Sequence, residues 1–353
     1  MTESAARPAG HRDELAANLA RWAGDDPLRA ATAQTLSAIA DATREIAGLI
    51  RLGPLAGALG QATGEANSDG DVQKKLDVLS NDAVLRALKT ASVSYFASEE
   101  ENEILSMKAD GLVAVAVDPL DGSSNIDTNA PIGTIFSLYP TAPAGATASF
   151  FRPGREQIAA GYAIYGPHTA LLLTVGAGVD MYVLDASNEY RLAVQGLMIP
   201  KAAQEYAINA SNYRFWRDPV REYIDELLAG VDGPRGRDFN MRWLASLVGD
   251  AHRILQRGGV YLYPADRRVG YEQGRLRLVY EAAPIAMIVV QAGGAASDGL
   301  APILDKIPER LHARTPLVFG APLKVERLVR YHADPPHDRA RPPLFAARGL
   351  FRT

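Results

Sequence analysis

Residues 112–127, LVAVAVDPLDGSSNID, pass from an apolar run into a dense group of polar side chains. The apolar part, Leu112 to Val117, is typical of a buried strand. Pro119 and Gly122 indicate a turn at the end of that strand. The stretch therefore predicts a strand that ends at a polar site, and no other stretch of the chain is as informative.

The residue types that follow the strand suit a divalent cation and a phosphate. Asp118 and Asp121 lie three residues apart with the Leu120 carbonyl between them, and Mg²⁺ prefers one or two carboxylates together with substrate phosphates. An ordinary surface turn of Asp, Gly and Ser is the structural alternative. Small residues come next, whose backbone N–H groups and hydroxyls can approach a phosphate, especially where a helix begins: Gly122, Ser123 and Ser124.

Composition limits the classes of protein to which the chain can belong. Its 353 residues suit two domains or one large one, and its 47% hydrophobic and 22% charged fractions are ordinary for a globular protein. A net charge of −4 and the lack of a basic aromatic stripe argue against a nucleic-acid partner. The chain has no cysteine, which removes disulfides, thiolate catalysis and zinc–thiolate sites.

Neither a membrane partner nor a secretory signal is expected. No apolar stretch reaches the roughly 18 residues that a spanning helix needs. Residues 1–26 are rich in Ala with mixed charge and lack the apolar core of a signal peptide. The cytoplasm is therefore the expected compartment.

The apolar pattern places helices and strands alternately along the chain. Helical spacing predicts a long helix over 28–50 and another over 71–89, and the glycine-rich segment between them is long for a passive connection. Interleaved helices and strands indicate an α/β or α+β fold in layers. Strands are expected at 93–97, 133–139, 159–165, 171–175, 181–184 and 317–319, and helices over 219–229 and from 284 to 293.

An acidic run, residues 99–103, follows one of the predicted strands. A run of Glu is usually a solvated face. Neighbouring strand ends lie side by side in a layered fold, however, so Glu99 and Glu100 can converge with Asp118 on one metal.

Two further clusters carry carboxylates. Residues 70–82, GDVQKKLDVLSND, mix Asp and Lys directly after the glycine-rich segment. They form either a helix N-terminus with acidic caps or a mobile carboxylate donor. Glu281 precedes a predicted helix, where it can be a partner of the helix dipole or a further ligand.

Together these clusters closely resemble the class 1 fructose-1,6-bisphosphatases. A colinear match from about residue 30 to 330 is more specific than any single motif. The shared strings are GDVQKKLDVLSND (70–82), SEE (98–100), DPLDGSSNID (118–127) and YEAAP (280–284). Weaker similarities are GTIFSLY (133–139), AAGYAIYG (159–166), DAHR (250–253) and GGVYLYPAD (258–266).

The resemblance implies a metal site and catalytic carboxylates. Two or three Mg²⁺ per subunit are expected, with Mn²⁺ as an alternative. Asp71 and Asp77 would belong to a mobile loop over 53–71 and its hinge, and Asp77 and Glu100 would help to activate water. The implied metal ligands are Glu99, Glu100, Asp118, Asp121, Glu281 and the carbonyl of Leu120.

The resemblance also implies a sugar bisphosphate as the substrate. The reacting phosphate would lie at Asp121, Gly122, Ser123 and Ser124. The distal phosphate would lie near Asn209, Tyr213 and Tyr263, with Arg275 near the sugar or its phosphate. Arg242 would reach the distal phosphate of a neighbouring subunit, and a homotetramer is expected.

The residue types agree with a phosphatase. A phosphate monoester carries about two negative charges, and divalent ions held by carboxylates neutralise this charge while they position an attacking water. A nearby carboxylate can take the proton from that water. With no Cys and no evident phosphohistidine pattern, attack by metal-activated water is expected rather than a covalent phospho-enzyme.

The implied fold is the five-layer α/β/α/β/α sandwich of the sugar-phosphatase superfamily. An N-terminal extension would cover residues 1–27 and an N-terminal domain residues 28–199. A C-terminal substrate domain would cover 200–333, followed by a Pro-rich tail over 334–353.

Some positions depart from the pattern of the family. Trp243 stands in place of Tyr and Arg275 in place of Lys, so affinity or substrate range can differ. The positions that hold AMP in inhibited members carry Leu112, Val113 and Pro140 here. Weak or absent inhibition by AMP is therefore expected.

The main hypothesis is hydrolysis of the 1-phosphate of D-fructose 1,6-bisphosphate, in gluconeogenesis or the Calvin cycle. The alternatives are sedoheptulose-1,7-bisphosphatase activity, alone or in addition, and a catalytically silent sugar-phosphate sensor. A sensor would be expected to have lost a carboxylate, and all are present. An inositol-monophosphatase-like enzyme shares the D-P-x-D-G motif but would lack the KKLDVLSND string (74–82) and the Arg242 segment.

Overall fold

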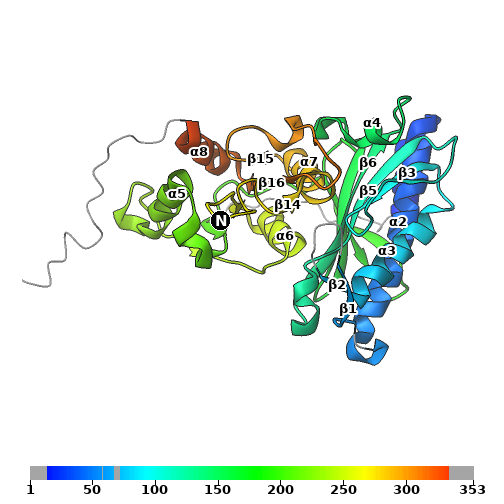
Figure 1. The fold of residues 1–353 in the computed structure, drawn as a ribbon, viewed down its shortest axis with the longest axis horizontal. Helices are drawn as coiled ribbons and strands as arrows, with labels where there is room; N and C mark the ends of the chain where they lie inside the picture. The colour runs from blue at the N-terminus through cyan, green and yellow to red at the C-terminus, as the bar shows by residue number, and fades with distance from the viewer. Residues whose placement is uncertain (1–13, 58, 67–71, 334–353) are drawn as a thin grey trace, which may run out of the picture.

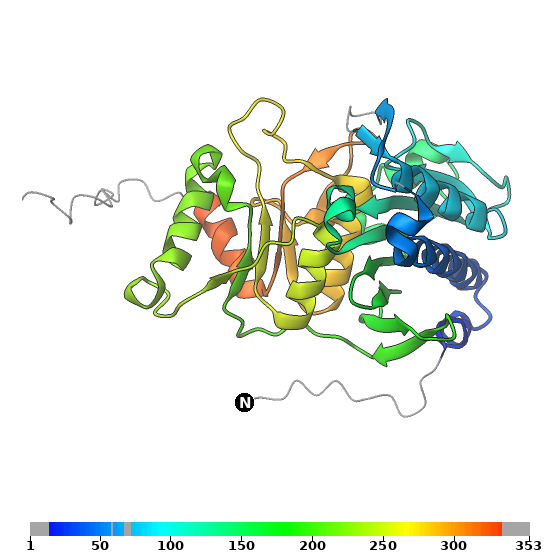
Figure 2. The same cartoon turned by 90° about the horizontal axis from the view of Figure 1, so that it is seen from below.

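The computed structural model of the chain describes residues 14–57, 59–66 and 72–333. These residues form two large sheets and three helical layers, which follow one another along the long axis of the molecule, and two small two-stranded sheets (Figure 1). The same succession is visible in the orthogonal view (Figure 2). The expected α/β/α/β/α sandwich is confirmed. No helix among the described residues is long and apolar enough to cross a membrane.

The larger sheet has eight strands and belongs to the N-terminal half. β3 and β5 are parallel, whereas the pairs from β5 through β10 are antiparallel. Every residue of β5 is buried, because helices cover both faces of the sheet. The spatial order is β10 (Tyr190–Val194), β9 (Asp180–Leu184), β8 (Thr169–Thr174), β7 (Ala159–Tyr165), β6 (Ile132–Pro140), β5 (Val113–Asp121), β3 (Val93–Ser98) and β4 (Leu105–Ser106).

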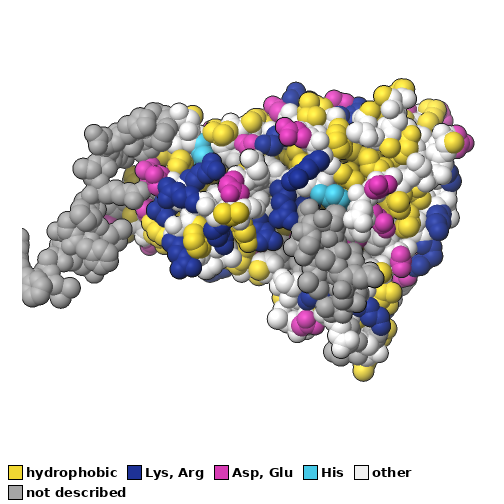
Figure 3. Space-filling view, in the orientation of Figure 1, with side chains coloured by type: hydrophobic (Ala, Val, Ile, Leu, Met, Phe, Trp, Pro, Cys, Tyr) yellow, Lys and Arg dark blue, Asp and Glu magenta, His cyan; other side chains and the backbone are white. Residues whose placement is uncertain are grey.

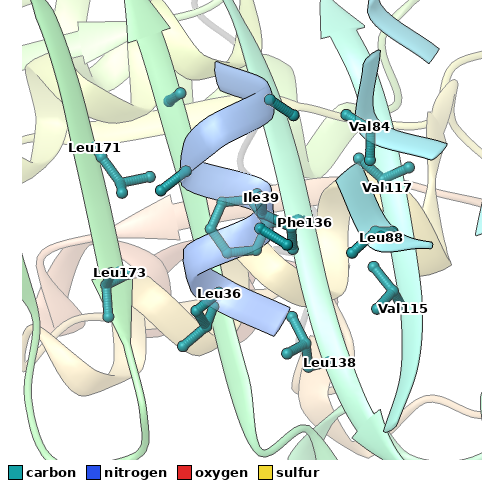
Figure 4. Packing of buried hydrophobic residues seen from close by; sticks show 14 of the residues in the cluster. Leu36, Ile39, Val84, Leu88, Val115, Val117, Phe136, Leu138, Leu171 and Leu173 are labelled. Atoms are coloured by element: carbon teal, nitrogen blue, oxygen red, sulfur yellow. The ribbon is translucent and has the colours of Figure 1, made fainter. Parts of the chain in front are cut away.

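Three helices cover the outer face of this sheet: α1 (Leu15–Ala23), α2 (Pro27–Leu52) and α3 (Lys75–Leu88). Helix α2 begins where the Asp26 side chain accepts a hydrogen bond from the Arg29 N–H, with Pro27 in the first turn. This confirms the predicted helix over 28–50. Figure 4 shows the layer packing on the sheet through residues that include Leu36, Ile39, Val84, Leu88, Val115, Val117, Phe136 and Leu138.

The helix predicted over 71–89 begins only at Lys75. Before it, β2 (Val72–Lys74) pairs with β1 (Ala62–Ala66), and η1 (Gly53–Ala56) follows α2. The segment 53–71, expected as a mobile loop, thus contains regular structure. Residues 58 and 67–71 lie outside the described residues.

A second helical layer lies between the two sheets. It contains α6 (Leu247–Arg257), a π-helical turn η6 (Leu278–Ala282) and α7 (Ala283–Gln291). Helix α7 is apolar on nearly all sides, as expected for a helix enclosed between layers. It confirms the helix predicted from residue 284.

The smaller sheet and its outer helices complete the C-terminal half. Helices α5 (Asp218–Leu228) and α8 (Pro322–Ala333) cover the outer face. The strand order is β12 (Asn240–Met241), β11 (Glu205–Ala207), β13 (Val260–Tyr263), β17 (Leu317–Gly320) and β15 (Ala295–Ser297). Short elements complete the chain: α4 (Ala146–Phe150), β14 (Leu276–Arg277), β16 (Arg314–Thr315), η3 (Gly154–Glu156), η5 (Gly230–Asp232) and η7 (Ile303–Asp305).

Candidate active site

The carboxyl ends of β3 and β5 bring two acidic segments together. The strands are parallel, with Ser98 opposite Val117. The Glu99 N–H donates to the Val117 carbonyl at 3.0 Å, and the Glu100 N–H donates to Ser98 Oγ at 3.3 Å. Glu99 and Glu100 therefore lie at the edge of the sheet where Asp118 follows Val117.

The turn predicted at Pro119 is displaced. β5 continues to Asp121, and its register against β6 shifts by one residue between Asp118 and Asp121. Such a bulge accommodates proline, which cannot donate a hydrogen bond to the ladder. The chain turns only at Gly122, whose φ of 78° lies in the left-handed region that favours glycine.

Asp121 is held by the N-terminus of α6. The Ser246 hydroxyl donates to Asp121 Oδ2 at 2.8 Å, and the N–H groups of Leu247 and Val248 donate to the same carboxylate at 3.2 and 2.9 Å. Ser246 Oγ also accepts from the Gly249 N–H and so caps the helix. An N-terminal helix dipole favours a carboxylate, so the helix layer fixes a side chain that the sheet supplies.

Glu281 comes from the π-helical turn η6, which runs directly into α7. The sequence placed it before the helix; it lies instead within helical structure, in a type of turn that is frequent at functional sites. Its Oε2 accepts from the Arg277 N–H at 2.5 Å. The Arg277 guanidinium forms an ion pair with Glu99 at 3.2 Å, which joins Glu281 and Glu99 through one residue.

Asp118, Asp121 and Glu281 form a buried carboxylate cluster. Each contributes an oxygen that lies within 4.8 Å of the others. Burial raises the pKa of all three, and the negative charge of Glu99 raises the pKa of Asp118 and Glu281 further. Because a bound cation would offset this repulsion, and carboxylate oxygens are the ligands of Mg²⁺ and Mn²⁺, the cluster fits a divalent metal.

Asp77 lies in the first turn of α3. Its Oδ2 accepts from the Lys74 N–H at 2.7 Å, while its Oδ1 is buried with no hydrogen-bond partner among the described residues. Burial raises the pKa of Asp77 to about 6, with a smaller contribution from Glu99. The Lys74 ammonium, at the end of β2 and directly before α3, donates to the Ser123 carbonyl at 2.9 Å and so joins this point of the chain to the segment after β5. Asp71 lies outside the described residues.

The small residues after Asp121 begin a short 3₁₀ helix, η2 (Ser123–Thr128), rather than an α-helix. Gly122 approaches α6 so closely that an added Cβ would lie 2.9 Å from Ser246 Cβ. Ser123 is partly buried and Ser124 is exposed. The segment therefore lies between the carboxylate cluster and solvent.

Two of the predicted substrate residues, Asn209 and Tyr263, line one small hollow in the C-terminal half. Asn209 precedes η4 (Ala210–Phe215), and Tyr263 ends β13. Asn212 and Arg268 line the same hollow. Amide, phenol and guanidinium groups are all hydrogen-bond donors. The hollow has a volume of only about 10 Å³, room for one water, so these donors can meet an anion at its mouth rather than enclose one.

The other predicted substrate residues do not line this hollow. The Tyr213 hydroxyl donates to Asp225 at 2.8 Å, and the Arg275 guanidinium donates to the Tyr271 hydroxyl. Arg242, at the end of β12, is exposed.

Three residues that contribute to these sites are not predicted from the sequence: Ser246, Arg277 and Arg268. Ser246 and Arg277 act on carboxylates that are distant in the chain, and neither belongs to a recognisable motif. Arg268 lies in a charged loop after Tyr263, where composition alone predicts a solvated turn.

Comparisons with known proteins agree with this arrangement. A profile described as "Fructose-1-6-bisphosphatase, N-terminal domain" matches residues 23–194, and one described as "Fructose-1-6-bisphosphatase, C-terminal domain" matches residues 199–333. The chain is 51% identical over 331 residues to a class 1 fructose-1,6-bisphosphatase of Rhodopseudomonas palustris (strain HaA2), which covers 94% of this chain and 96% of the relative. The chain belongs to the class 1 fructose-1,6-bisphosphatase family.

Other members of the class 1 fructose-1,6-bisphosphatase family are similarly close. A relative from Cereibacter sphaeroides (strain ATCC 17025 / ATH 2.4.3) is 55% identical over 288 residues, which are 81% of this chain and 86% of the relative. The crystal structure of Leishmania major fructose-1,6-bisphosphatase in holo form superposes with a TM-score of 0.84 at 36% identity, covering 92% of this chain and 99% of the other. The resemblance seen in the sequence and the prediction of a phosphatase are confirmed.

Proposed function

We propose that the protein hydrolyses the 1-phosphate of D-fructose 1,6-bisphosphate, in a Mg²⁺-dependent reaction that yields fructose 6-phosphate and phosphate. The buried cluster of Asp118, Asp121 and Glu281, in a chain of this family, is the observation that carries the proposal. A cation held there would neutralise phosphate charge and lower the pKa of a water. The residues that would hold two or three such ions are Glu99, Glu100, Asp118, Asp121, Glu281 and the Leu120 carbonyl.

The chain's own residues accept the proton and orient the reacting phosphate. Asp77 accepts a proton, because its free oxygen is buried beside the site and its pKa, raised to about 6, is close to neutral. Glu100 assists from the end of β3, and Asp71 from the segment before β2. The N–H groups from Gly122 to Ser124 orient the reacting phosphate.

The distal phosphate lies at the mouth of the hollow lined by Asn209 and Tyr263, with Tyr213 and Arg275 nearby. Arg242 comes from a neighbouring subunit of a homotetramer. Its guanidinium is exposed and donates within its own chain to the Met241 carbonyl. An exposed arginine at this position is available to a second copy of the chain.

Inhibition by AMP is proposed to be weak. Val113 is fully buried and is directly opposite Pro140 in the β5–β6 pair. Neither side chain can donate a hydrogen bond to a phosphate. A micromolar inhibition constant for AMP would contradict this proposal.

Phosphate release from fructose 1,6-bisphosphate and sedoheptulose 1,7-bisphosphate, measured in parallel with Mg²⁺ and with EDTA, tests the function. Turnover that EDTA abolishes and that Asp121→Ala lacks supports the proposal. The ratio of the two rates decides between the fructose and sedoheptulose substrates. No turnover of either ester by folded, metal-loaded protein would favour a sensor.

A further inference from the structure

The loop after β13 holds one arginine in an unusually fixed position. The Arg268 guanidinium carbon lies 4.0 Å from the centroid of the Tyr271 ring and 4.7 Å from that of Phe215. Cation–π contacts with two rings restrict a side chain that otherwise has many rotamers. The two rings come from separate segments of the chain, which only the fold brings together on Arg268.

Besides the two rings, the Asp266 carboxylate holds the Arg268 guanidinium. Asp266 is only 3% exposed, and its carboxylate accepts from Arg268 Nε at 3.0 and 3.1 Å and from Nη2. The hydrogen bonds from Arg268 hold the pKa of Asp266 below its usual range despite burial. A guanidinium has five N–H donors, and the bonds to Asp266 use only those on Nε and Nη2. Among the described residues no acceptor pairs with Nη1, so its donors are available to a ligand.

The loop after β13 is hydrogen-bonded to η4, which lies on the other side of the hollow. The Arg267 N–H donates to the Phe215 carbonyl at 3.0 Å, and the Asp266 N–H donates to the Tyr271 carbonyl at 3.1 Å. These bonds fix the positions of Phe215 and Tyr271 relative to Asp266. Arg268 is therefore placed before any ligand arrives.

Arg268 lines the hollow together with Asn209, Asn212 and Tyr263. Asp266 is the one carboxylate among the lining residues, and Arg268 already occupies it. Arg275 contacts the Tyr271 ring, with its guanidinium carbon 4.7 Å from the ring centroid, but it does not line the hollow. Figure 3 shows Lys and Arg side chains gathered over the part of the molecule that contains α5 and α6.

We propose that Arg268 binds the distal phosphate of the substrate and is a determinant of specificity for bisphosphates over monophosphates. Asp266, Phe215 and Tyr271 are positioning residues that hold its guanidinium. The proposal rests on the function proposed above and names a further ligand of the same substrate. It predicts that the planar guanidinium, rather than positive charge alone, is required.

The test compares two substrates that differ only in the distal phosphate, fructose 1,6-bisphosphate and fructose 1-phosphate. In Arg268→Gln, kcat/KM for the bisphosphate should fall about tenfold or more, since hydrogen bonds to charged groups are strong. The value for fructose 1-phosphate should stay within about twofold, since this ester never reaches Arg268. Arg268→Lys should recover only part of the loss.

A binding measurement makes the result independent of turnover. Calorimetric titration with fructose 6-phosphate, which carries only the distal phosphate, should show affinity about tenfold weaker in Arg268→Gln. Arg267→Gln is the matched control, because Arg267 is half exposed and pairs with Asp218 at 3.2 Å. It should bind like the wild type.

Three outcomes would overturn the proposal: equal losses for both substrates, unchanged kinetics with unchanged binding, or an equal effect of Arg267→Gln. Equal losses would make Arg268 a structural support only. A wild-type protein that hydrolyses neither ester would reject the proposed function instead, and the fructose 6-phosphate titration would still decide the role of Arg268.

Discussion

Asp77 has one carboxylate oxygen held by the Lys74 N–H and the other buried with no hydrogen-bond partner among the described residues. We expect Asp77→Asn to lower kcat about 10²-fold or more, because an amide keeps the first contact but cannot accept a proton. Phosphate release is the measurement. Asp82→Asn, on the exposed side of the same helix, should leave kcat unchanged, and a fully active Asp77→Asn would remove Asp77 from the proposed chemistry.

The buried carboxylates also make the stability of the metal-free protein depend on pH. Their pKa values are raised in the folded state, so between about pH 4 and those values the folded chain binds more protons than the unfolded chain. Stability contributed by these groups is therefore lost as pH rises through this range. A bound cation requires the ionised form, which is favoured at high pH.

Melting temperatures with Mg²⁺ and with EDTA, at pH 5.5 and pH 8, test this linkage. We expect the increase caused by Mg²⁺ to be larger at pH 8, since protons compete with the cation less there. In Asp118→Asn both the increase and its dependence on pH should shrink. The same increase at both pH values in the wild type would show that these carboxylates do not bind the cation.

At the scale of elements, the contact between the N-terminus of α6 and Asp121 contributes most to the site. Ser246→Ala removes a hydrogen bond to Asp121 and the cap of the helix. We expect a loss of about 1–2 kcal/mol in the free energy of unfolding and about 10–100-fold weaker metal binding. Both quantities are accessible by denaturant unfolding and by titration with Mn²⁺.

The α2 cap provides a control for this variant. Asp26→Ala also removes a helix cap, through the contact with the Arg29 N–H at 2.9 Å, but lies far from the carboxylate cluster in the sequence. It should cost similar stability and leave metal affinity unchanged. If Ser246→Ala behaved the same way, α6 would have no part in holding the metal site.

Local sequence carried most of the information about elements. The apolar run of β5 and the helical spacing of α2 each predict a structure that depends on periodicity alone, and both elements are present. The layered fold and the position of the acidic segments at neighbouring strand ends followed from these elements and from the family resemblance.

Features that depend on long-range contact could not be predicted in this way. Strand β5 continues past Pro119 because β6 accommodates a bulge, and the π-helical turn around Glu281 forms against the sheet. Ser246 meets Asp121 across 125 residues of sequence. Arg268 is sandwiched by rings from two separate segments, so its position is a property of the tertiary structure.

At the scale of the whole molecule, substitution of Arg242 tests the proposed homotetramer. If a neighbouring subunit supplies it, Arg242→Ala should raise KM for fructose 1,6-bisphosphate about tenfold or more, while the mass in light scattering stays that of a tetramer. Dilution of the wild type below its assembly range should raise KM in the same way. A monomeric protein with an unchanged KM would contradict the proposal.

The contact between Asp121 and α6 has a consequence for the order in which the protein matures. A ribosome releases Asp118 and Asp121 before Ser246, and Ser246 before Glu281. The nascent N-terminal half can build its sheet but holds only part of the carboxylate cluster. Metal binding that needs all three carboxylates would therefore follow synthesis of Glu281, and it would report that both halves of the chain have met.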